Sequence, residues 1–535
     1  MSLLKASLMN PPSYFSPDAK RSGATPPMLR RWRACASALA LALGGCAVGP
    51  NFSPPASPDV DRFTATPAAA ATGDRNGPKV ASQHFVHGGE VAAKWWAAFR
   101  SQPLNDLIRM SVEHNPSLQS AESAIRVAEF NALAQRGLFF PQVGANYTPS
   151  YQLQGTNGVA VPNVNTDTQF ALHTLQLNVS FVPDVWGSNL RSVESLDATA
   201  ENQLFQLEAA YLALTANVAT AAIQEASLRG QIEATHKIIK IERDILDVLK
   251  NQLKYGQAAQ LDVLTQEAAL AQVEQTLPPL DKQLAVQRDL LTALAGQFSA
   301  DEVLQKFTLK SLALPTNLPL SLPSTLVRQR PDVRAAEANM HSAAALVGVA
   351  IAARLPNVVL SANPGYSAVN TAALFMPATG FYTLAASITA PVFDGFTLYH
   401  KQKAAEAFLD QADATYRQTV ITAIQNVADA VKSLQTDARA VQAAVKSEVA
   451  AKVSLDIVFK QLQAGQVNQV TVLTAQQTYF NALIARVQAE ASRLSATAAL
   501  FLALGGNWPV DCKTPNWRDC AMGEPPPPQV VADAK

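Results

Sequence analysis

Neither glycine nor proline occurs between Phe396 and Ala464, in the stretch FTLYHKQKAAEAFLDQADATYRQTVITAIQNVADAVKSLQTDARAVQAAVKSEVAAKVSLDIVFKQLQA. Gly395 and Gly465 bound this stretch on either side. A continuous helix over these about 69 residues would be roughly 100 Å long, because each residue adds about 1.5 Å. No single compact domain is that wide, so we expect the helix to extend beyond any one globular core.

The apolar residues of this stretch follow a heptad pattern, in which steps of four and three alternate. This spacing places them on one helix face and is typical of long helices that pack side by side. They are Val420, Ile424, Val427, Val431, Leu434, Ala438, Val441 and Val445. A second stretch, Gly187–Tyr255, contains no proline and one internal glycine, Gly230. Its apolar positions are Leu207, Tyr211, Leu214, Val218, Ala221, Leu228, Ile232, Leu246, Leu249 and Leu253. We therefore predict two very long helices.

The composition limits what these helices can face. The formal net charge is +0 and we find no basic patch with interleaved aromatic residues, so we expect no nucleic-acid partner. Only 16% of the residues are charged, whereas exposed coiled-coil faces are normally rich in Glu and Lys. Uncharged polar faces suit helices that meet other helices or line a water-filled space. No run reaches the roughly 18 apolar residues of a spanning helix, so we expect any membrane crossing to use strands.

The N-terminal region contains a secretory signal. A basic segment, Met28–Arg33, precedes the apolar run Ala34–Leu43 and the sequence Gly-Gly-Cys46. This arrangement resembles a bacterial lipobox, which implies cleavage before Cys46 and lipidation of its sulfur; an ordinary signal peptide is the alternative. Ala47 follows, where an aspartate would signal retention in the inner membrane, so the lipobox resemblance implies the outer membrane.

Because residues 28–46 form a complete signal, we expect Met28 to be the start codon. We assign residues 1–45 to an N-terminal extension and signal peptide. Residues 46–93 are rich in Pro, Ala and Gly and predict an extended, lipid-anchored tether, with ordered structure beginning near Trp95.

The rest of the chain contains two copies of one unit. Pro116-Ser-Leu-Gln-Ser-Ala-Glu122 matches Pro331-Asp-Val-Arg-Ala-Ala-Glu337, and Tyr255-Gly-Gln-Ala-Ala-Gln-Leu-Asp-Val-Leu-Thr265 matches Ala464-Gly-Gln-Val-Asn-Gln-Val-Thr-Val-Leu-Thr474. In each copy we expect a short helix, a strand pair, a long helix, a turn and a return helix. We assign the copies to residues 94–297 and 324–507, a linker to 298–323 and a tail to 508–535.

Each copy contains a predicted strand pair before its long helix. Pro141 and Pro356 end the preceding helices, and apolar and polar residues then alternate. The alternating apolar residues are Val143, Ala145, Tyr147, Leu175, Leu177, Val179 and Phe181 in the first copy, and Leu384, Ala386, Ile388, Ala390 and Val392 in the second. The pattern is typical of outer-membrane barrel strands, with lipid outside and water inside, but a soluble sandwich strand shows it too.

The number of strands favours the barrel. Two copies supply only four strands, which cannot close a barrel, and open sheet edges are not tolerated in lipid. We therefore predict an α+β fold in which three chains share one transmembrane barrel of about twelve strands. The long coiled-coil helices would hang from this barrel as a helical bundle with a hollow axis.

Further motifs occur in order along the chain. They are Gly45-Cys-Ala-Val-Gly-Pro-Asn-Phe52, Trp95-Trp96, Leu104-Asn-Asp-Leu-Ile108, Asn115-Pro116, Pro183-Asp-Val-Trp-Gly187, Arg330-Pro-Asp-Val-Arg-Ala-Ala-Glu337, Ala350 to Pro356 and Pro391-Val-Phe-Asp-Gly395. In order and spacing, from about Cys46 to Trp508, the chain resembles the outer-membrane efflux proteins, a TolC-like family, and within it the OprM/NodT lipoprotein branch.

The resemblance implies a homotrimer with a barrel in the outer membrane, a helical tunnel through the periplasm and an equatorial belt formed by residues 298–324 and the C-terminal residues. It also implies the exit duct of a tripartite efflux pump, which conducts drugs or other small solutes passively. A periplasmic membrane-fusion adaptor and an inner-membrane RND transporter would be its partners. The helix–strand corners would be Pro141, Pro183, Gly187, Pro356, Pro391 and Gly395.

The turns near Gly256 and Gly465 would lie farthest from the barrel, because they join the long helices to their return helices. Glycine allows a tight reversal there. The resemblance makes these turns the gate and the adaptor-docking tip. The candidate residues are Tyr255, Gly256, Gln260, Asp262, Gly465, Gln469, Thr471 and Thr474.

Two of these residues have alternative interpretations. Asp262 either lines a polar constriction or favours the N-terminal end of its return helix, and Tyr255 either hydrogen-bonds across the closed mouth or packs between helices. The family often carries acidic residues on the second tip, where this chain has Thr471 and Thr474. We therefore expect a thinner acidic ring, with Asp262 as its main member.

We expect neither an enzymatic activity nor a cofactor. His84 and His87 lie close together in the tether but without a Cys or carboxylate cluster, so we predict no metal site. The chain has no GxSxG or HExxH motif and no phosphate-binding glycine loop after a strand. Cys512 and Cys520 predict a disulfide in an oxidising compartment; two free thiols are the alternative.

Three other functions remain open from the sequence. A duct of this kind also suits type I protein secretion or heavy-metal efflux. The alternative from another class is a lipid-anchored periplasmic coiled-coil scaffold or adaptor.

Overall fold

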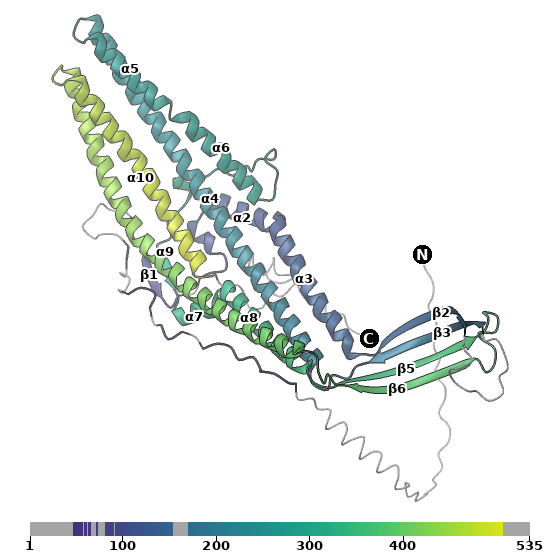
Figure 1. Cartoon of the computed structure of the whole chain (residues 1–535). Coiled ribbons are helices and arrows are strands. Elements are labelled where there is room, and N and C mark those ends of the chain that lie inside the picture. Colours follow the sequence, from purple (N-terminus) through teal and green to yellow (C-terminus); the bar gives the residue numbers. More distant parts are fainter. Residues whose placement is uncertain are drawn as a thin grey trace, which may run out of the picture.

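The two glycine-bounded stretches form continuous helices of 67 residues each, α4 (Ser188–Lys254) and α9 (Thr397–Gln463). The structure is a computed structural model that describes residues 47–56, 58–60, 62–65, 71–72, 81–89, 91–153 and 169–506. The heptad prediction is confirmed, because Val427, Val431 and Leu434 on α9 are at most 2% exposed. The helical tips lie at one end of an elongated chain and a sheet lies at the other (Figure 1).

The element order helix, two strands, long helix and return helix occurs twice. In the first half these are α3 (Pro116–Arg136), β2 (Gln142–Leu153), β3 (Gln169–Phe181), α4, α5 (Gln260–Glu274) and α6 (Leu277–Leu294). In the second half they are α8 (Pro331–Ala352), β5 (Asn357–Ala368), β6 (Gly380–Thr389), α9 and α10 (Gln469–Ala503). The remaining elements are β1 (His84–His87), η1 (Trp95–Phe99), α2 (Gln102–His114), η2 (Gly137–Phe139), η3 (Leu309–Ser311), β4 (Asn317–Leu320) and α7 (Pro323–Gln329).

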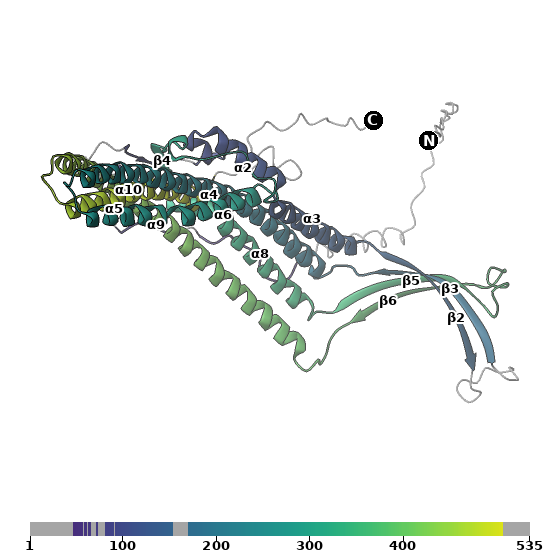
Figure 2. The same cartoon turned by 90° about the horizontal axis from the view of Figure 1, so that it is seen from above.

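Helices and strands are arranged in matching rows. The strands form one antiparallel sheet in the order β2-β3-β5-β6. The helices joined to them pack in the corresponding order α3-α4-α8-α9, so that α3 and α9 flank the row (Figure 2). Within the described residues, β2 and β6 each have a strand neighbour on one side only. The chain is therefore an open wall with two free flanks.

The register places the predicted apolar residues on one face of the sheet. Tyr147 lies opposite Leu175, Val179 opposite Ala362, and Leu384 likewise opposite Ala362. Large side chains of this face are exposed, including Val143 (66%), Leu384 (72%) and Ile388 (73%). The predicted strand in the second half was too long: β6 ends at Thr389, because Pro391 has no N–H to donate to a ladder.

Two of the four helical columns are built from stacked helices. The Asn115 side chain at the start of α3 donates to the carbonyl oxygen of Leu294 at the end of α6 (3.0 Å). In the second half, the guanidinium of Arg330 at the start of α8 donates to the carbonyl oxygen of Ala503 at the end of α10 (2.7 Å). These two joints place α3 below α6 and α8 below α10, beside the continuous helices α4 and α9.

The first return helix is broken, which the sequence analysis did not predict. It is divided into α5 and α6 at Gln275 and Thr276. Pro278 and Pro279 follow in the first turn of α6, where their missing N–H groups are tolerated only at a helix start. The second return helix, α10, lacks such a pair and is continuous over 35 residues.

Regular structure begins before Trp95, contrary to the sequence-based expectation. Strand β1 pairs in parallel with β4. Just before it, the Gln83 side chain donates to the carbonyl oxygen of Pro315 and to the Thr497 hydroxyl, both at 3.0 Å. These partners are far away in the sequence, which is why composition alone indicated a plain tether.

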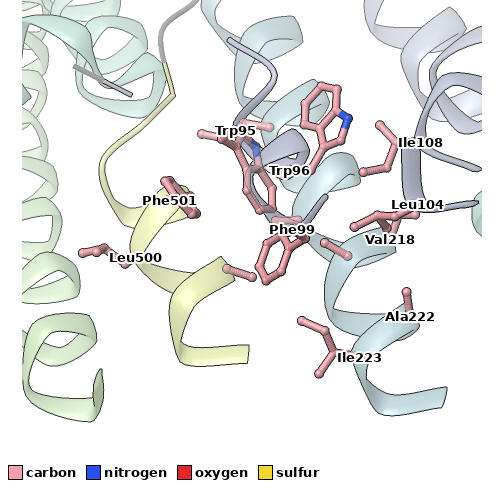
Figure 3. Packing of buried hydrophobic residues seen from close by; sticks show 14 of the residues in the cluster. Trp95, Trp96, Phe99, Leu104, Ile108, Val218, Ala222, Ile223, Leu500 and Phe501 are labelled. Atoms are coloured by element: carbon pink, nitrogen blue, oxygen red, sulfur yellow. The ribbon is translucent and has the colours of Figure 1, made fainter. Parts of the chain in front are cut away.

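An aromatic cluster fixes the middle of the wall, where η1 packs between α4 and α10 (Figure 3). The Trp95 ring stacks on Phe501 with centroids 5.4 Å apart and meets Phe99 edge-on at 6.3 Å. Trp96 meets Tyr211 of α4 edge-on at 6.3 Å. Phe99 is fully buried, so this cluster ties the N-terminal segment to both halves of the chain.

One described helix, α8, is long and apolar enough to cross a membrane by length and composition. It contains no uninterrupted run of roughly 18 apolar residues, because Asp332, Arg334 and Glu337 lie within it. Half of its most apolar window is buried inside the chain, between α4 and α9. Buried core helices pass the same test, so α8 is weak evidence for a membrane span.

We predict that Phe99→Ala lowers the free energy of unfolding by about 3–5 kcal/mol, because it leaves a cavity in the aromatic cluster. Phe298→Ala is the matched control, since the Phe298 ring is 83% exposed and its truncation leaves no cavity. Chemical denaturation followed by circular dichroism measures both. Equal losses in the two variants would show that the cluster does not anchor the wall.

Candidate gate at the helical tips

Both long helices end in the same reversal. The amide of Gly256 donates to the carbonyl oxygen of Leu253 (2.9 Å), and that of Gln257 donates to Gln252 (2.8 Å). The bonds from Gly465 and Gln466 at the end of α9 are equivalent, both at 2.9 Å. This is the Schellman pattern, which needs a left-handed residue; Gly256 has φ +73° and Gly465 has φ +70°.

Most of the predicted tip residues lie at the surface, and one does not. Tyr255 is 74% exposed, so its ring does not pack between helices of this chain. Gln260, Thr471 and Thr474 are also exposed. Gln469, in contrast, is only 6% exposed and points into the bundle.

Asp262 on the first tip and Asn468 on the second cap the return helices. The Asp262 carboxylate accepts a hydrogen bond from the amide of Ala259 (3.1 Å). At the start of α10 the Asn468 side chain accepts bonds from the amide (3.0 Å) and hydroxyl (2.8 Å) of Thr471. Capping satisfies amides that a helix start leaves unpaired, so the helix-end interpretation accounts for the contacts of Asp262 within this chain.

A buried polar cluster lies behind the tips. Glu242 of α4 accepts hydrogen bonds from Gln266 of α5 and from Gln476 of α10 (2.8 Å). Gln469 donates in turn to Gln266. All four side chains are at most 6% exposed. The cluster therefore joins three helices through side chains that are buried in an otherwise apolar bundle.

Burial sets the proton affinity of this cluster. It disfavours the charged carboxylate and raises the pKa of Glu242 to about 7, and the hydrogen bonds from Gln266 and Gln476 only partly oppose this rise. Glu242 also lines a groove of about 540 Å³ whose walls include Thr265 and Gln272 of α5 and Thr474 of α10. Glu242 was not among the residues selected from the sequence. It lies one helical turn from Ile238 and Ile245, which are buried, and this spacing indicates that Glu242 is on the buried face of α4.

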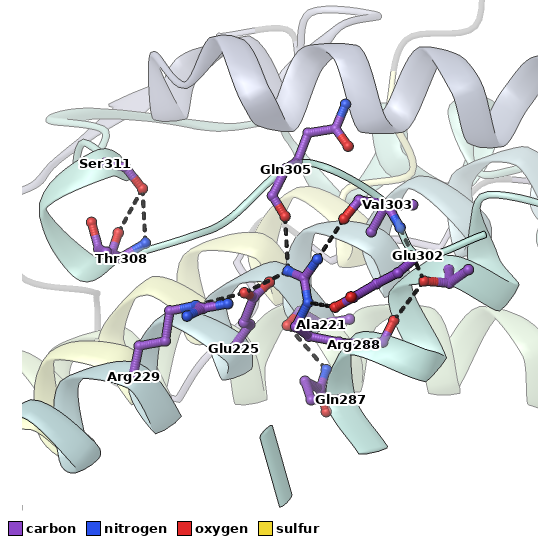
Figure 4. Close-up of polar contacts among 11 residues, drawn as sticks. Ala221, Glu225, Arg229, Gln287, Arg288, Glu302, Val303, Gln305, Thr308 and Ser311 are labelled. Carbon is purple, nitrogen blue, oxygen red and sulfur yellow. Dashed lines mark hydrogen bonds and ion pairs between the residues drawn. The ribbon is translucent and has the colours of Figure 1, made fainter. Parts of the chain in front are cut away.

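A second buried network holds the linker that follows α6 (Figure 4). The Arg288 guanidinium of α6 binds the carboxylate of Glu225 on α4 at 3.0 Å. It also donates to Glu302 and to the carbonyl oxygens of Val303 and Gln305 (2.9 Å for Gln305). Glu225 is fully buried and has a second partner in Arg229 (2.7 Å), so one arginine joins the wall to the linker.

The six predicted corner residues lie between the strands and the helices. Pro141 and Pro356 precede β2 and β5, and Pro183 and Pro391 follow β3 and β6. Gly187 (φ +73°) and Gly395 (φ +65°) lead into the long helices.

Two aspartates within the quoted corner motifs were not singled out. Asp184 accepts from the amides of Asn189 (2.9 Å) and Leu190 (2.7 Å), and Asp394 accepts from Leu398 (2.8 Å). Each caps the first turn of a long helix, which fixes the direction in which the helix leaves the sheet.

Three predicted residues, Cys46, Cys512 and Cys520, lie outside the described residues. Among the described residues no group of three or more His, Cys, Asp or Glu side chains forms a metal-binding cluster.

The chain is similar to known outer-membrane proteins. The family model described as outer membrane efflux protein matches residues 107–297 and 322–506. The pyoverdine export outer membrane protein OpmQ of Pseudomonas putida is 27% identical over 428 residues, 79% of this chain and 89% of that protein.

Two solved structures share the fold. The outer membrane protein VceC of Vibrio cholerae is 26% identical with a TM-score of 0.72, over 78% of this chain and 99% of that one. The outer-membrane channel OprN is 24% identical with a TM-score of 0.77, over 86% of this chain and all of that one.

We predict that Arg288→Met lowers the free energy of unfolding by about 3–5 kcal/mol, because it removes one partner of a buried ion pair. Arg243→Met is the matched control: its pair with Glu274 is exposed, and such pairs contribute about 0–1 kcal/mol. Denaturant titration of both variants measures the difference. A similar small loss in both would show that the linker does not depend on Arg288.

Proposed function

Since the chain belongs to the outer membrane efflux protein family, we propose that it is the outer-membrane exit duct of a tripartite efflux pump. It would conduct drugs or other small solutes passively from the periplasmic partners to the exterior, with energy supplied by those partners. The observation that carries this proposal is the open wall: four helical columns and four strands in one order, with free flanks at α3–β2 and at β6–α9.

A homotrimer closes this wall most simply. Three copies would supply about twelve strands, within the range of known barrels, and the exposed apolar face of Val143, Leu384 and Ile388 would then face lipid. The opposite face, with residues such as Gln142, Asn178 and Ser361, would line a water-filled lumen. A lipid-anchored scaffold, the rival from another class, would leave this apolar face in water.

The two helical flanks have apolar surfaces that suit such closure. On α3, Val127 (61%), Phe130 (67%) and Leu133 (54%) are exposed at helical spacing. On the far flank, Phe408 (41%) and Ile421 (60%) of α9 are exposed. Different surfaces on opposite flanks make a head-to-tail contact that closes into a ring if the rotation fits. We infer that α3 of one copy packs against α9 of the next.

The equivalent joints at Asn115 and Arg330 support the inference that the two halves are copies of one unit. The boundaries of these copies would be residues 94–297 and 324–507, with a linker at 298–323 that contributes to an equatorial belt. Pro141, Pro183, Gly187, Pro356, Pro391 and Gly395 would mark the membrane boundary, and a lipid on Cys46 would anchor the tether to the outer membrane.

The tips would form the periplasmic gate and would dock a membrane-fusion adaptor, which links the duct to an inner-membrane RND transporter. The residues in this role would be Tyr255, Gly256, Gln260, Asp262, Gly465, Thr471 and Thr474. The exposure of the Tyr255 ring supports a contact beyond this chain. Gln469, which is buried, would act inside the bundle.

We predict that Phe130→Asp abolishes the trimer, because it introduces a charge into the apolar contact between α3 and α9. Leu304→Asp is the control, since Leu304 is 91% exposed in the linker. Light scattering in detergent and heat-modifiable gel migration report the oligomeric state. A wild-type protein that is monomeric, or a trimer that survives Phe130→Asp, would contradict the proposed assembly.

We predict that the wild-type protein conducts in planar bilayers and that a trivalent cation added on the tip side blocks it weakly, since Asp262 supplies the main acidic ring. Thr471→Asp with Thr474→Asp would add carboxylates and tighten the block about tenfold, or about 1.4 kcal/mol. Thr436→Asp, a change on the exposed surface of α9 away from the tip, controls for added charge. Tight block of the wild type would mean that the ring is not thin.

A further inference from the structure

The cluster of Glu242, Gln266, Gln469 and Gln476 occupies the point where the return helices α5 and α10 both rest on α4. Each helix contributes at least one side chain, and Glu242 is the shared acceptor of the bonds from α5 and α10. Loss of these bonds would therefore release both return helices from the same helix. No other charged side chain belongs to the cluster.

Burial in the bundle favours a neutral Glu242, and two buried amide oxygens of the cluster lack a donor in the described part of the chain. The amide oxygens of Gln469 and Gln476 have no hydrogen-bond partner among the described residues, although both side chains are buried. A protonated carboxyl group carries an O–H that can donate to an amide oxygen, whereas a carboxylate is an acceptor only. An unpaired buried acceptor is costly, so a proton on Glu242 would give the cluster an additional donor, whereas the N–H groups of Gln266 and Gln476 favour the carboxylate.

No positively charged side chain among the neighbours described below compensates the negative charge of an ionised Glu242. Arg243 and Lys250 of α4 are engaged at the surface by Glu274 and Glu267 of α5 (2.7 and 2.9 Å). From α10, the titratable group nearest in sequence is Tyr479, whose pKa burial raises, so it stays neutral. From α9, Glu448 binds Arg486, and Lys452, Asp456 and Lys460 are exposed. Burial and the two glutamines are the influences that act on Glu242.

We propose that Glu242, Gln266, Gln469 and Gln476 form a proton-operated latch at the tip, in which the protonated carboxyl group holds α5 and α10 against α4 and loss of the proton loosens them. This inference names a regulation of the gate and rests on the proposed function for its biological meaning. The groove beside Glu242 provides the route by which water and protons reach the carboxyl group.

The direction of the pH dependence follows from the difference in the pKa of Glu242 between the packed tip and a loosened tip. In the packed tip Glu242 has a pKa of about 7, whereas a hydrated glutamate in a loosened tip has a value of about 4.3. The latch is therefore strongest below pH 4 to 5 and weakens as the pH rises through 7. Between pH 6 and pH 8 the equilibrium for loosening rises about tenfold by this linkage.

Hydrogen exchange of the full-length protein in detergent tests the latch. The amides to follow are those of residues 260–266 and 469–476, with rates divided by the intrinsic chemical rate at each pH. We expect the opening equilibrium to rise about tenfold from pH 6 to pH 8. Glu242→Gln, which mimics the protonated form in shape and charge, should remove this rise and keep exchange slow at both pH values.

Glu267→Gln is the matched control. It removes one carboxylate from the same region, but Glu267 lies at the surface in a pair with Lys250 and outside the cluster, so it should keep the wild-type pH profile. A pH rise that persists in Glu242→Gln would overturn the proposal, as would its loss in Glu267→Gln.

A second variant covers the case in which Glu242→Gln does not fold. Gln476→Met removes one N–H donor from the carboxylate and should shift the midpoint of the exchange transition to higher pH; an unchanged midpoint would overturn the latch. Exchange needs neither a membrane nor a partner. If exchange depends on pH but the protein does not conduct, the proposed duct is rejected and the latch is retained. If the protein conducts but its exchange does not depend on pH, the latch is rejected and the duct is retained.

Discussion

The length of α4 and α9 is the constraint on which the rest of the structure depends. Each spans 67 residues without a break, so neither can fold back to complete a core of its own. Each of the other α-helices packs against α4, α9 or both. The short helices fill the spaces beside them in stacked pairs, the strands continue from the lower ends, and η1 with its aromatic residues joins the two halves at mid-height.

Features governed by local sequence could be predicted. Continuous helices follow from the absence of Gly and Pro, the reversals follow from Gly256 and Gly465, and the alternation in β3 gives its two faces. Features that depend on contacts with residues distant in the sequence could not be predicted. Gln469 was named among the tip candidates, and nothing in the sequence indicated that it is buried, because its partner, Gln266, lies on the other return helix. In the same way, β1 forms because it pairs with β4, and the composition of residues 46–93 does not predict that pairing.

Two of the buried charged residues lie where three segments of chain meet. Glu242 lies between α4, α5 and α10, and Arg288 lies between α4, α6 and the linker. Helix faces rich in Ala and Leu pack almost equally well after a shift by one turn, because their side chains are small and similar. A shift of that size would leave a buried carboxylate or guanidinium without its partner, at a cost of several kcal/mol. These residues therefore select one register from several that apolar contacts alone would allow.

The joints at Asn115 and Arg330 give the wall uneven stiffness. A continuous helix resists bending along its whole length, whereas a column of two helices in end-to-end contact has a hinge held by one side-chain bond and a left-handed glycine, Gly296 or Gly505. Rigid and jointed columns alternate across the chain. A force applied at the tips would thus bend the two jointed columns at Asn115 and Arg330. The continuous helices α4 and α9 would instead transmit the displacement to the sheet.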